Sequence, residues 1–317
     1  MNRFLRTFAV AAVTVAAPLA ALAADWTPPG PIKLMIGFGA GGGADTQARL
    51  IAEAIEAKHG WTILPEQVTG NSGLNLLTAL KDEPADGTAI GMIVTETMAY
   101  NLVASPESGL NAGDFTPLAT TAAFRMGLVA MADGEFSSWE QVKAAAEAGK
   151  AVRFGTATTR QGDMAYHLGK GAGIDFNIVS VKGGKAIMNG LRGGDLDIGW
   201  VAGAQAKAVA QGEMINVARG IDTPLRETPE APSITDIGSQ FYLDGNFMFA
   251  APGGMDPAVR DALAGAIAEV LADSGTGASQ LVTRAFGGAT VIKGDELDAM
   301  LAKAAGDSQA LLKDVTE

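Results

Sequence analysis

The residues with the clearest potential for ligand chemistry are glycines. Residues 37–43 read GFGAGGG and stand between an apolar run and a stretch with helical patterning. Glycine lets the backbone turn tightly and approach a ligand without an intervening side chain. A helix that starts here would direct its unpaired N–H groups and the positive end of its dipole at the same point. The sequence therefore predicts an anion site built from backbone amides.

Other interpretations of this stretch stay open. Gly37, Gly39 and Gly42 also match the dinucleotide pattern G-x-G-x-x-G, which is a weak signal in any glycine-rich segment. A purely structural turn is a second alternative. Asp45 and Arg49 are four residues apart and could form a surface ion pair. Alternatively, Asp45 lies at the rim of the pocket and holds the amides of the loop or a bound water.

Further polar groups follow other predicted strands. Residues 69–73, TGNSG, precede a helical stretch, and residues 95–97, TET, end the third strand. In the second half of the chain, residues 156–162, TATTRQG, and residues 182–185, KGGK, repeat the arrangement of loop before helix. Because open α/β sheets place ligands at the carboxyl ends of their strands, we expect these loops to converge on one cleft. A turn with an N-cap, or solvated lysines, are the simpler alternatives.

No catalytic set is visible. The chain lacks cysteine, a G-x-S-x-G elbow and an H-E-x-x-H pair, and its two histidines, His59 and His167, are far apart. Asp195 and Asp197 fit turn and cap positions better than an acid–base pair. We therefore expect no enzyme activity, no cofactor and no metal.

The N-terminus has the layout of an export signal. Arg3 and Arg6 precede an apolar run over residues 8–19, and residues 21–23, ALA, fit a cleavage site. Residues 1–23 are therefore predicted to be a signal peptide that delivers a protein without a lipid anchor to the periplasm. A retained membrane anchor is the alternative. The net charge of −12 leaves no electrostatic basis for binding nucleic acid.

The alternation of short apolar runs with helical stretches indicates the α/β class, with two lobes and mainly parallel sheets. We expect the first lobe to comprise residues 24–125 and 246–317, with a strand near residues 247–250 that returns to it. The second lobe is expected over residues 126–245. Within it, Ser137 and Glu140 form an S-x-x-E capping box before a helix that ends near Gly149.

Ordered fragments of the chain resemble the solute-binding proteins of tripartite tricarboxylate transporters, the Bug family. Each fragment is weak alone, but their order and spacing together are specific. The matching elements are residues 31–43 with Asp45 and Arg49, residues 86–88, 115–118, 167–168, 172–174, 182–184, 193–197 and 226–238.

The resemblance implies a periplasmic binding protein of the Venus-flytrap type, which we expect to be a monomer. It would bind a small carboxylate between its lobes and deliver it to a membrane permease of one large and one small subunit. The residues expected at the ligand are Phe38, Gly39, Ala40, Gly41, Gly42, Asp45, Asn71, Ser72, Gly73, Thr95, Glu96, Thr156, Thr158, Thr159, Arg160, Lys182, Gly183 and Gly184.

Two charged residues depart from the family pattern. Arg160 stands where small residues are usual and could clamp a second ligand carboxylate. Glu96 would repel an anion unless it pairs with a cation such as Arg160, meets a ligand hydroxyl or ammonium group, or faces away. The alternatives for function are a periplasmic sensor that feeds a signalling receptor, a binder of a non-carboxylate or zwitterionic ligand, and an enzyme on a borrowed fold.

Overall fold

A computed structural model describes residues 26–316 of the chain. The predicted signal peptide lies outside these residues. Within the described part, no helix has both the length and the apolar character needed to cross a membrane.

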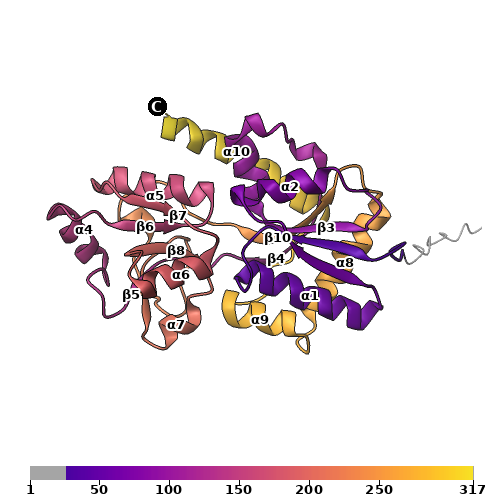
Figure 1. Cartoon of the computed structure of the whole chain (residues 1–317), viewed down its shortest axis with the longest axis horizontal. Coiled ribbons are helices and arrows are strands. Elements are labelled where there is room, and N and C mark those ends of the chain that lie inside the picture. The colour runs from indigo at the N-terminus through magenta and orange to yellow at the C-terminus, as the bar shows by residue number, and fades with distance from the viewer. Residues whose placement is uncertain (1–25, 317) are drawn as a thin grey trace, which may run out of the picture.

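Two five-stranded sheets form the framework, and each sheet with its helices is called a lobe below (Figure 1). The first sheet has the order β2-β1-β3-β10-β4 and the second the order β7-β6-β8-β5-β9. The strands are β1 Ile32–Ile36, β2 Ile63–Gln67, β3 Ala89–Val94, β4 Phe115–Ala123, β5 Met126–Met131, β6 Arg153–Thr156, β7 Asn177–Ser180, β8 Ile198–Ala202, β9 Met214–Arg219 and β10 Asn246–Pro252.

The two-lobed α/β class predicted from the sequence is confirmed, but both sheets are mixed rather than mainly parallel. β1 pairs in parallel with β2 and β3, whereas β10 pairs antiparallel with β3 and β4. The antiparallel strands are those that carry the chain between lobes: β4 leads out into β5, and β10 leads back in. The Phe124 amide donates to the Gly245 carbonyl at 2.7 Å, which joins the two crossing segments.

The return of the chain to the first sheet through β10 agrees with the strand expected near residues 247–250. The residue limits of the two lobes stay a prediction. Three of the strands and α-helices were not foreseen: strand β4, the short helix α3 over Leu102–Ala104 and helix α9 over Gly277–Phe286.

Helices cover both faces of each sheet, and alternate strand residues meet different helices. In β1, Leu34 packs in the cluster that contains α1, α8 and α9, whereas Met35 packs with α2 and α10. Helix α3 contacts α10 in the first lobe, and helices α4–α7 belong to the second lobe. The helices are α1 Gly43–His59, α2 Leu74–Lys81, α3 Leu102–Ala104, α4 Trp139–Glu147, α5 Thr159–Ala172, α6 Gly184–Gly193, α7 Ala206–Ala210, α8 Pro257–Ala272, α9 Gly277–Phe286 and α10 Gly294–Thr316.

The N-terminus of α4 corrects the capping box predicted at Ser137 and Glu140. The N-cap is Ser138, whose Oγ accepts from the Gln141 amide, and Gln141 Oε1 accepts from the Ser138 amide. A glutamine side chain satisfies the Ser138 amide as well as a glutamate would, so the box is displaced by one residue.

Replacement of the two neighbouring serines separates these positions. We expect Ser138→Ala to lower the free energy of unfolding by about 1 kcal/mol, because the amide of Gln141 loses its acceptor. Ser137→Ala should cost less, because the Ser137 hydroxyl donates only to Gln141 Oε1, which keeps its bond from the Ser138 amide. Urea unfolding of both variants measures the difference, and equal losses would contradict the assignment of the N-cap.

Candidate ligand-binding site

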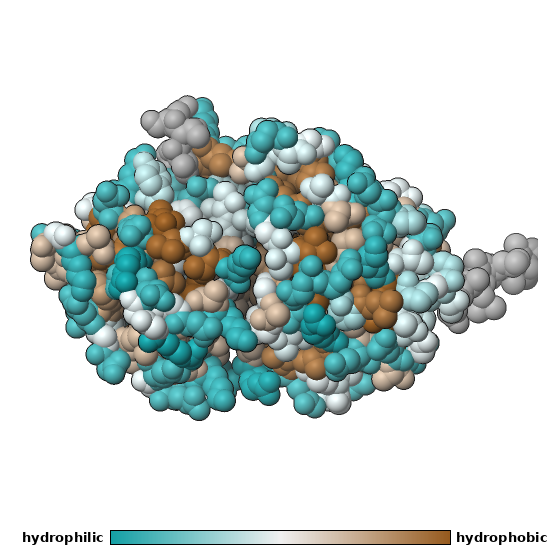
Figure 2. Space-filling model, in the orientation of Figure 1, coloured by the Kyte–Doolittle hydropathy of each residue, from teal (hydrophilic) through white to brown (hydrophobic). Residues whose placement is uncertain are grey.

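Two adjoining pockets lie between the lobes, whose surfaces abut over much of the face shown in Figure 2. The pocket lined by residues 42–44 and 183–185, called the inner pocket below, encloses about 70 Å³. The pocket lined by residues 69–72 and Thr159, called the outer pocket, encloses about 830 Å³. Both are bordered by Phe38 and Gly39 of the first lobe and by Ala157, Thr158 and residues 182–183 of the second. The loops expected to converge from the two halves therefore line the same cleft.

Helix α1 presents an uncapped N-terminus to the inner pocket. Its N-cap is Gly42, which supplies no side-chain acceptor, and Gly42, Gly43 and Ala44 line the pocket. The amides at the start of a helix have no partner within the helix, so they are available to a ligand.

Asp45 shapes this loop without lining either pocket. Its Oδ2 accepts from the Gly41 amide at 2.8 Å, and its Oδ1 accepts from Arg49 Nε at 2.9 Å and Gln67 Nε2 at 2.6 Å. The carboxylate is almost fully buried. Asp45 thus pairs with Arg49 and holds the Gly41 amide of the loop, but it lies neither on the surface nor at the edge of a pocket.

A second uncapped helix faces the first from the other lobe. The N-cap of α6 is Gly183, again without a side-chain acceptor, and it adopts φ +96°. Lys182, Gly183, Gly184 and Lys185 all line the inner pocket opposite α1. The pocket therefore receives two positive helix ends and two lysines, which makes it a strongly anion-attracting environment.

The lobes touch directly around these loops. A Cβ on Gly39 would lie only 2.7 Å from the Lys182 carbonyl oxygen, so only glycine permits this approach. Ser72 Oγ accepts from the Thr159 amide at 2.7 Å and lies 3.0 Å from Thr159 Oγ1. Tyr100 Oη donates to Asp163 Oδ2 at 2.7 Å. These contacts describe a cleft in its closed form.

The loop that carries Ser72 is held in an unusual backbone conformation. Asn71 and Ser72 have φ of +47° and +52°, which side-chain-bearing residues rarely adopt. Asn101 Nδ2 and Thr97 Oγ1 both donate to the Ser72 carbonyl, at 2.8 and 3.2 Å. Backbone strain of this kind persists where surrounding contacts enforce it, often beside a ligand.

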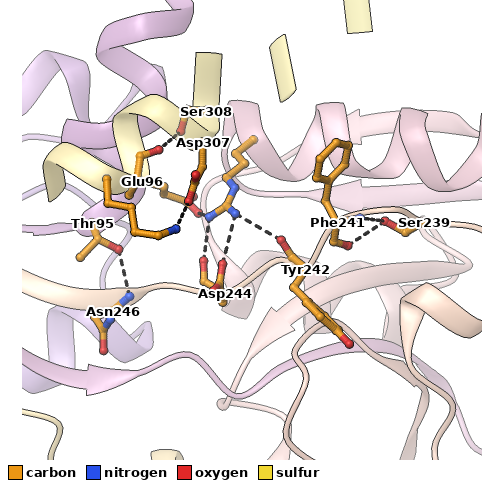
Figure 3. Close-up of polar contacts among 12 residues, drawn as sticks. Thr95, Glu96, Ser239, Phe241, Tyr242, Asp244, Asn246, Asp307 and Ser308 are labelled. Carbon is orange, nitrogen blue, oxygen red and sulfur yellow. Dashed lines mark hydrogen bonds and ion pairs between the residues drawn. The ribbon is translucent and has the colours of Figure 1, made fainter. Parts of the chain in front are cut away.

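Glu96 lies inside the inner pocket, next to a π-helical turn over Thr97–Asn101. Its side chain is 2% exposed, and among the described residues neither carboxylate oxygen has a well-oriented hydrogen-bond partner. Burial raises the pKa of Glu96, and nearby Arg160 and Thr158 oppose that effect. Glu96 therefore faces inward and only loosely pairs with Arg160, whose Nη1 is 3.9 Å from Oε2 (Figure 3).

Arg160 does not line either pocket, in contrast to the expected clamp. Its Nη1 donates to the Asp244 carbonyl at 2.7 Å, and its Nη2 donates to the Tyr242 carbonyl at 3.2 Å. The guanidinium thus ties α5 of the second lobe to the segment that leads into β10 (Figure 3). Its hydrogen bonds are directed at this segment rather than at a ligand.

The expected site residues form three groups, of which the first two overlap because some residues line both pockets. Those in the inner pocket are Phe38, Gly39, Gly42, Glu96, Thr158, Lys182, Gly183 and Gly184. Those in the outer pocket are Phe38, Gly39, Asn71, Ser72, Thr156, Thr158, Thr159, Lys182 and Gly183. Those that line neither are Ala40, Gly41, Asp45, Gly73, Thr95 and Arg160.

Two residues of the third group contact segments next to the pockets. Gly73 has φ +92° and packs against Thr97, and Thr95 Oγ1 accepts from the Asn246 amide at 3.0 Å (Figure 3). Thr95 therefore connects the end of β3 to the start of β10.

Sequence reasoning missed the apolar wall of the inner pocket. It includes Val94, Phe124, Met126 and Phe247, which lie at or next to strand ends near the crossing between the lobes, and Trp200 in the middle of β8. Nothing in the local sequence distinguishes these residues from ordinary core positions. Only the arrangement of the sheets brings them to the pocket.

Comparison with known proteins shows which proteins this chain resembles. No family model matches the chain. It is 26% identical over 267 residues to the UPF0065 protein in the gbd 5′ region of Cupriavidus necator, with 81% of each chain covered. It is also 26% identical over 284 residues to a UPF0065 protein from the ttuE–ttuC′ intergenic region of Agrobacterium vitis, with 86% and 79% covered. The chain is therefore similar to two UPF0065 proteins over most of its length.

Solved structures agree with this relationship at the level of the fold. The periplasmic binding protein BugD matches with a TM-score of 0.78 at 20% identity, over 92% of this chain and 99% of BugD. MatC from Rhodopseudomonas palustris with bound malate matches at 0.78 and 17%, over 90% and 99%. An R. palustris protein with adipate matches at 0.78 and 21%, over 92% and 99%.

The resemblance to the Bug family found in the sequence is thereby confirmed. The chain is similar to UPF0065 proteins and shares the two-lobed fold of BugD.

The raised pKa of Glu96 predicts how stability depends on pH. Because the pKa is higher in the folded than in the unfolded chain, stability is complete below the unfolded value, about 4.5, and falls as pH rises through the folded value. We expect Glu96→Gln to raise Tm by about 2–4 °C at pH 8 and to change it little at pH 4.

Thermal unfolding of ligand-free protein across this pH range makes the comparison. Glu107→Gln removes an exposed carboxylate and serves as the control, since its effect should be small at both pH values. A Glu96→Gln curve parallel to the wild-type curve throughout would refute the assignment of the raised pKa.

Proposed function

We propose that this protein is a periplasmic solute-binding protein that captures a small organic carboxylate and delivers it to a tripartite tricarboxylate transporter. The observation that carries the proposal is the meeting of two uncapped helix N-termini, from α1 and α6 in opposite lobes, at one pocket. Backbone amides at helix N-termini are suited to binding carboxylates and phosphates.

The local field favours an anion although the whole chain carries a net charge of −12. Lys182 and Lys185 flank the N-terminus of α6 and line the pocket. In a pocket screened from water, these nearby charges and dipoles outweigh more distant acidic residues. An anion placed there would contact both lobes at once.

The remaining pocket walls favour an organic anion over an inorganic one. Phe124, Met126 and Phe247 offer apolar surface next to the helix ends, which suits the carbon skeleton of a carboxylic acid. Two proteins with the same fold hold malate and adipate, which are both carboxylates.

Ligand capture would work through closure of the lobes. A ligand that contacts both α1 and α6 binds the closed form more tightly than the open form and shifts the population toward it. The crossing segments at Phe124 and Gly245 are the natural hinge, because they join the lobes. The closed protein would then dock on a permease of one large and one small subunit after export through its signal peptide.

A thermal-shift screen of ligand-stripped protein tests the proposal. The panel contains dicarboxylates, tricarboxylates, aromatic acids, amino acids, phosphate and sulfate. We expect one class of carboxylate to raise Tm by several degrees, because a ligand that binds only the native state stabilises it. Stabilisation by phosphate or sulfate alone, or by no compound, would overturn the carboxylate assignment.

Gly39→Ala tests the role of closure. The new methyl group would collide with the Lys182 carbonyl oxygen only when the lobes meet. We expect ligand affinity in isothermal titration calorimetry to fall by at least about 10-fold, equivalent to about 1.4 kcal/mol. Tm without ligand should change little. The matched control is Gly30→Ala, whose Cβ meets nothing within 4 Å and which should bind normally. Normal affinity in Gly39→Ala would exclude this closed geometry from the bound state.

A further inference from the structure

The inner pocket contains buried polar atoms that its anion-binding side does not explain. Glu96 Oε1 and Oε2 and Trp200 Nε1 are all buried without a hydrogen-bond partner among the described residues. Both side chains line the inner pocket, and they are 2% and 0% exposed. Buried polar atoms are nearly always paired in native proteins, with protein, water or ligand, so these three need partners within the pocket.

The apolar residues that line the pocket cannot satisfy these atoms. Val94, Phe124, Met126 and Phe247 supply only apolar side chains to this part of the pocket. The guanidinium of Arg160, the nearest cation, is directed at the carbonyls of residues 242 and 244.

The neighbouring Thr158 can satisfy at most one of the two carboxylate oxygens, because its hydroxyl group has a single proton. Its Oγ1 already accepts from the Gln161 amide as the N-cap of α5. The unmet requirement is therefore for both a hydrogen-bond donor and an acceptor, to be supplied from within the pocket.

We propose that the ligand is a hydroxy acid, whose carboxylate lies at the N-termini of α1 and α6 and whose hydroxyl group pairs with Glu96 and Trp200. The inference rests on the proposed function and names its ligand class. A hydroxyl group is the smallest group that both donates and accepts. It donates to a carboxylate oxygen of Glu96 and accepts from the indole N–H of Trp200.

Other substituents satisfy only part of this set. An ammonium group donates but accepts nothing, so it leaves Trp200 Nε1 unpaired. A second carboxylate in this position accepts from Trp200 but meets the carboxyl group of Glu96, which it repels when both are ionised. A methylene group leaves all three atoms unpaired. The inner pocket, at about 70 Å³, also restricts this part of the ligand to a few non-hydrogen atoms.

The test uses two sets of acids that differ in one substituent. The first set is succinate, malate and aspartate, and the second is propanoate, lactate and alanine. Dissociation constants are measured by isothermal titration calorimetry for wild-type protein and for Glu96→Leu, Glu96→Gln and Trp200→Phe. Trp139→Phe is the matched control, since Trp139 is buried against Phe176 in the second lobe and lines neither pocket.

In at least one set, we expect the hydroxy acid to bind wild-type protein at least about 10-fold more tightly than the unsubstituted acid and the amino acid. Glu96→Leu should abolish this preference, and it should not weaken binding of the unsubstituted acid, because it removes a carboxylate from the pocket. Glu96→Gln should keep most of the preference, because an amide still accepts from and donates to a hydroxyl group. Trp200→Phe should reduce the preference, and Trp139→Phe should not.

Several outcomes would overturn the proposal, and they differ from failure of the function itself. Equal binding of substituted and unsubstituted acids, a preference for the amino acid, or a hydroxyl preference that survives in Glu96→Leu would each refute the hydroxy-acid assignment while carboxylate binding stands. Failure of both sets, and of every carboxylate in the thermal-shift panel, would refute the proposed function and this inference with it.

Discussion

The binding cleft depends on one constraint: the first amides of a helix have no hydrogen-bond partner within that helix. In α1 and α6 the cap positions are Gly42 and Gly183, which supply no side-chain acceptor. Both helix ends therefore need an external acceptor, and both face the inner pocket. Because the helices belong to different lobes, one anion can satisfy both only when the lobes meet. The capping requirement of two helices is thus linked to the closure of the whole protein.

The rest of the cleft serves to hold these helix ends in place. Asp45 fixes the loop before α1 through the Gly41 amide, and Asn101 with Thr97 fixes the strained Ser72 loop. On the hinge side, Arg160 ties α5 to the carbonyls of the segment that enters β10. These contacts stabilise the two sides of the cleft, as the proposed closure of the lobes requires.

Glu96 and Trp200 show that the pocket has two chemically different parts. One part consists of amides and lysines and suits a carboxylate. The other consists of apolar side chains among which three buried polar atoms lack partners. A general anion receptor has no use for the second part, because a buried carboxyl group opposes anion binding. Its presence is therefore best explained by selectivity among acids.

Sequence alone determined the local elements and the identity of the loops. The glycines within residues 37–43 and 182–185 directly follow apolar runs and predict loops that a ligand can approach. This prediction depends only on the local freedom of the backbone. The alternation of short apolar runs with helical stretches predicted two α/β lobes, because this pattern also depends on residues close together in the sequence. Tertiary structure decided what depends on distant residues. It assigned Arg160 to the hinge segment, turned Glu96 inward and brought Phe124, Trp200 and Phe247 to one wall. These outcomes follow from where two mixed sheets meet, and no short stretch of the chain contains that information.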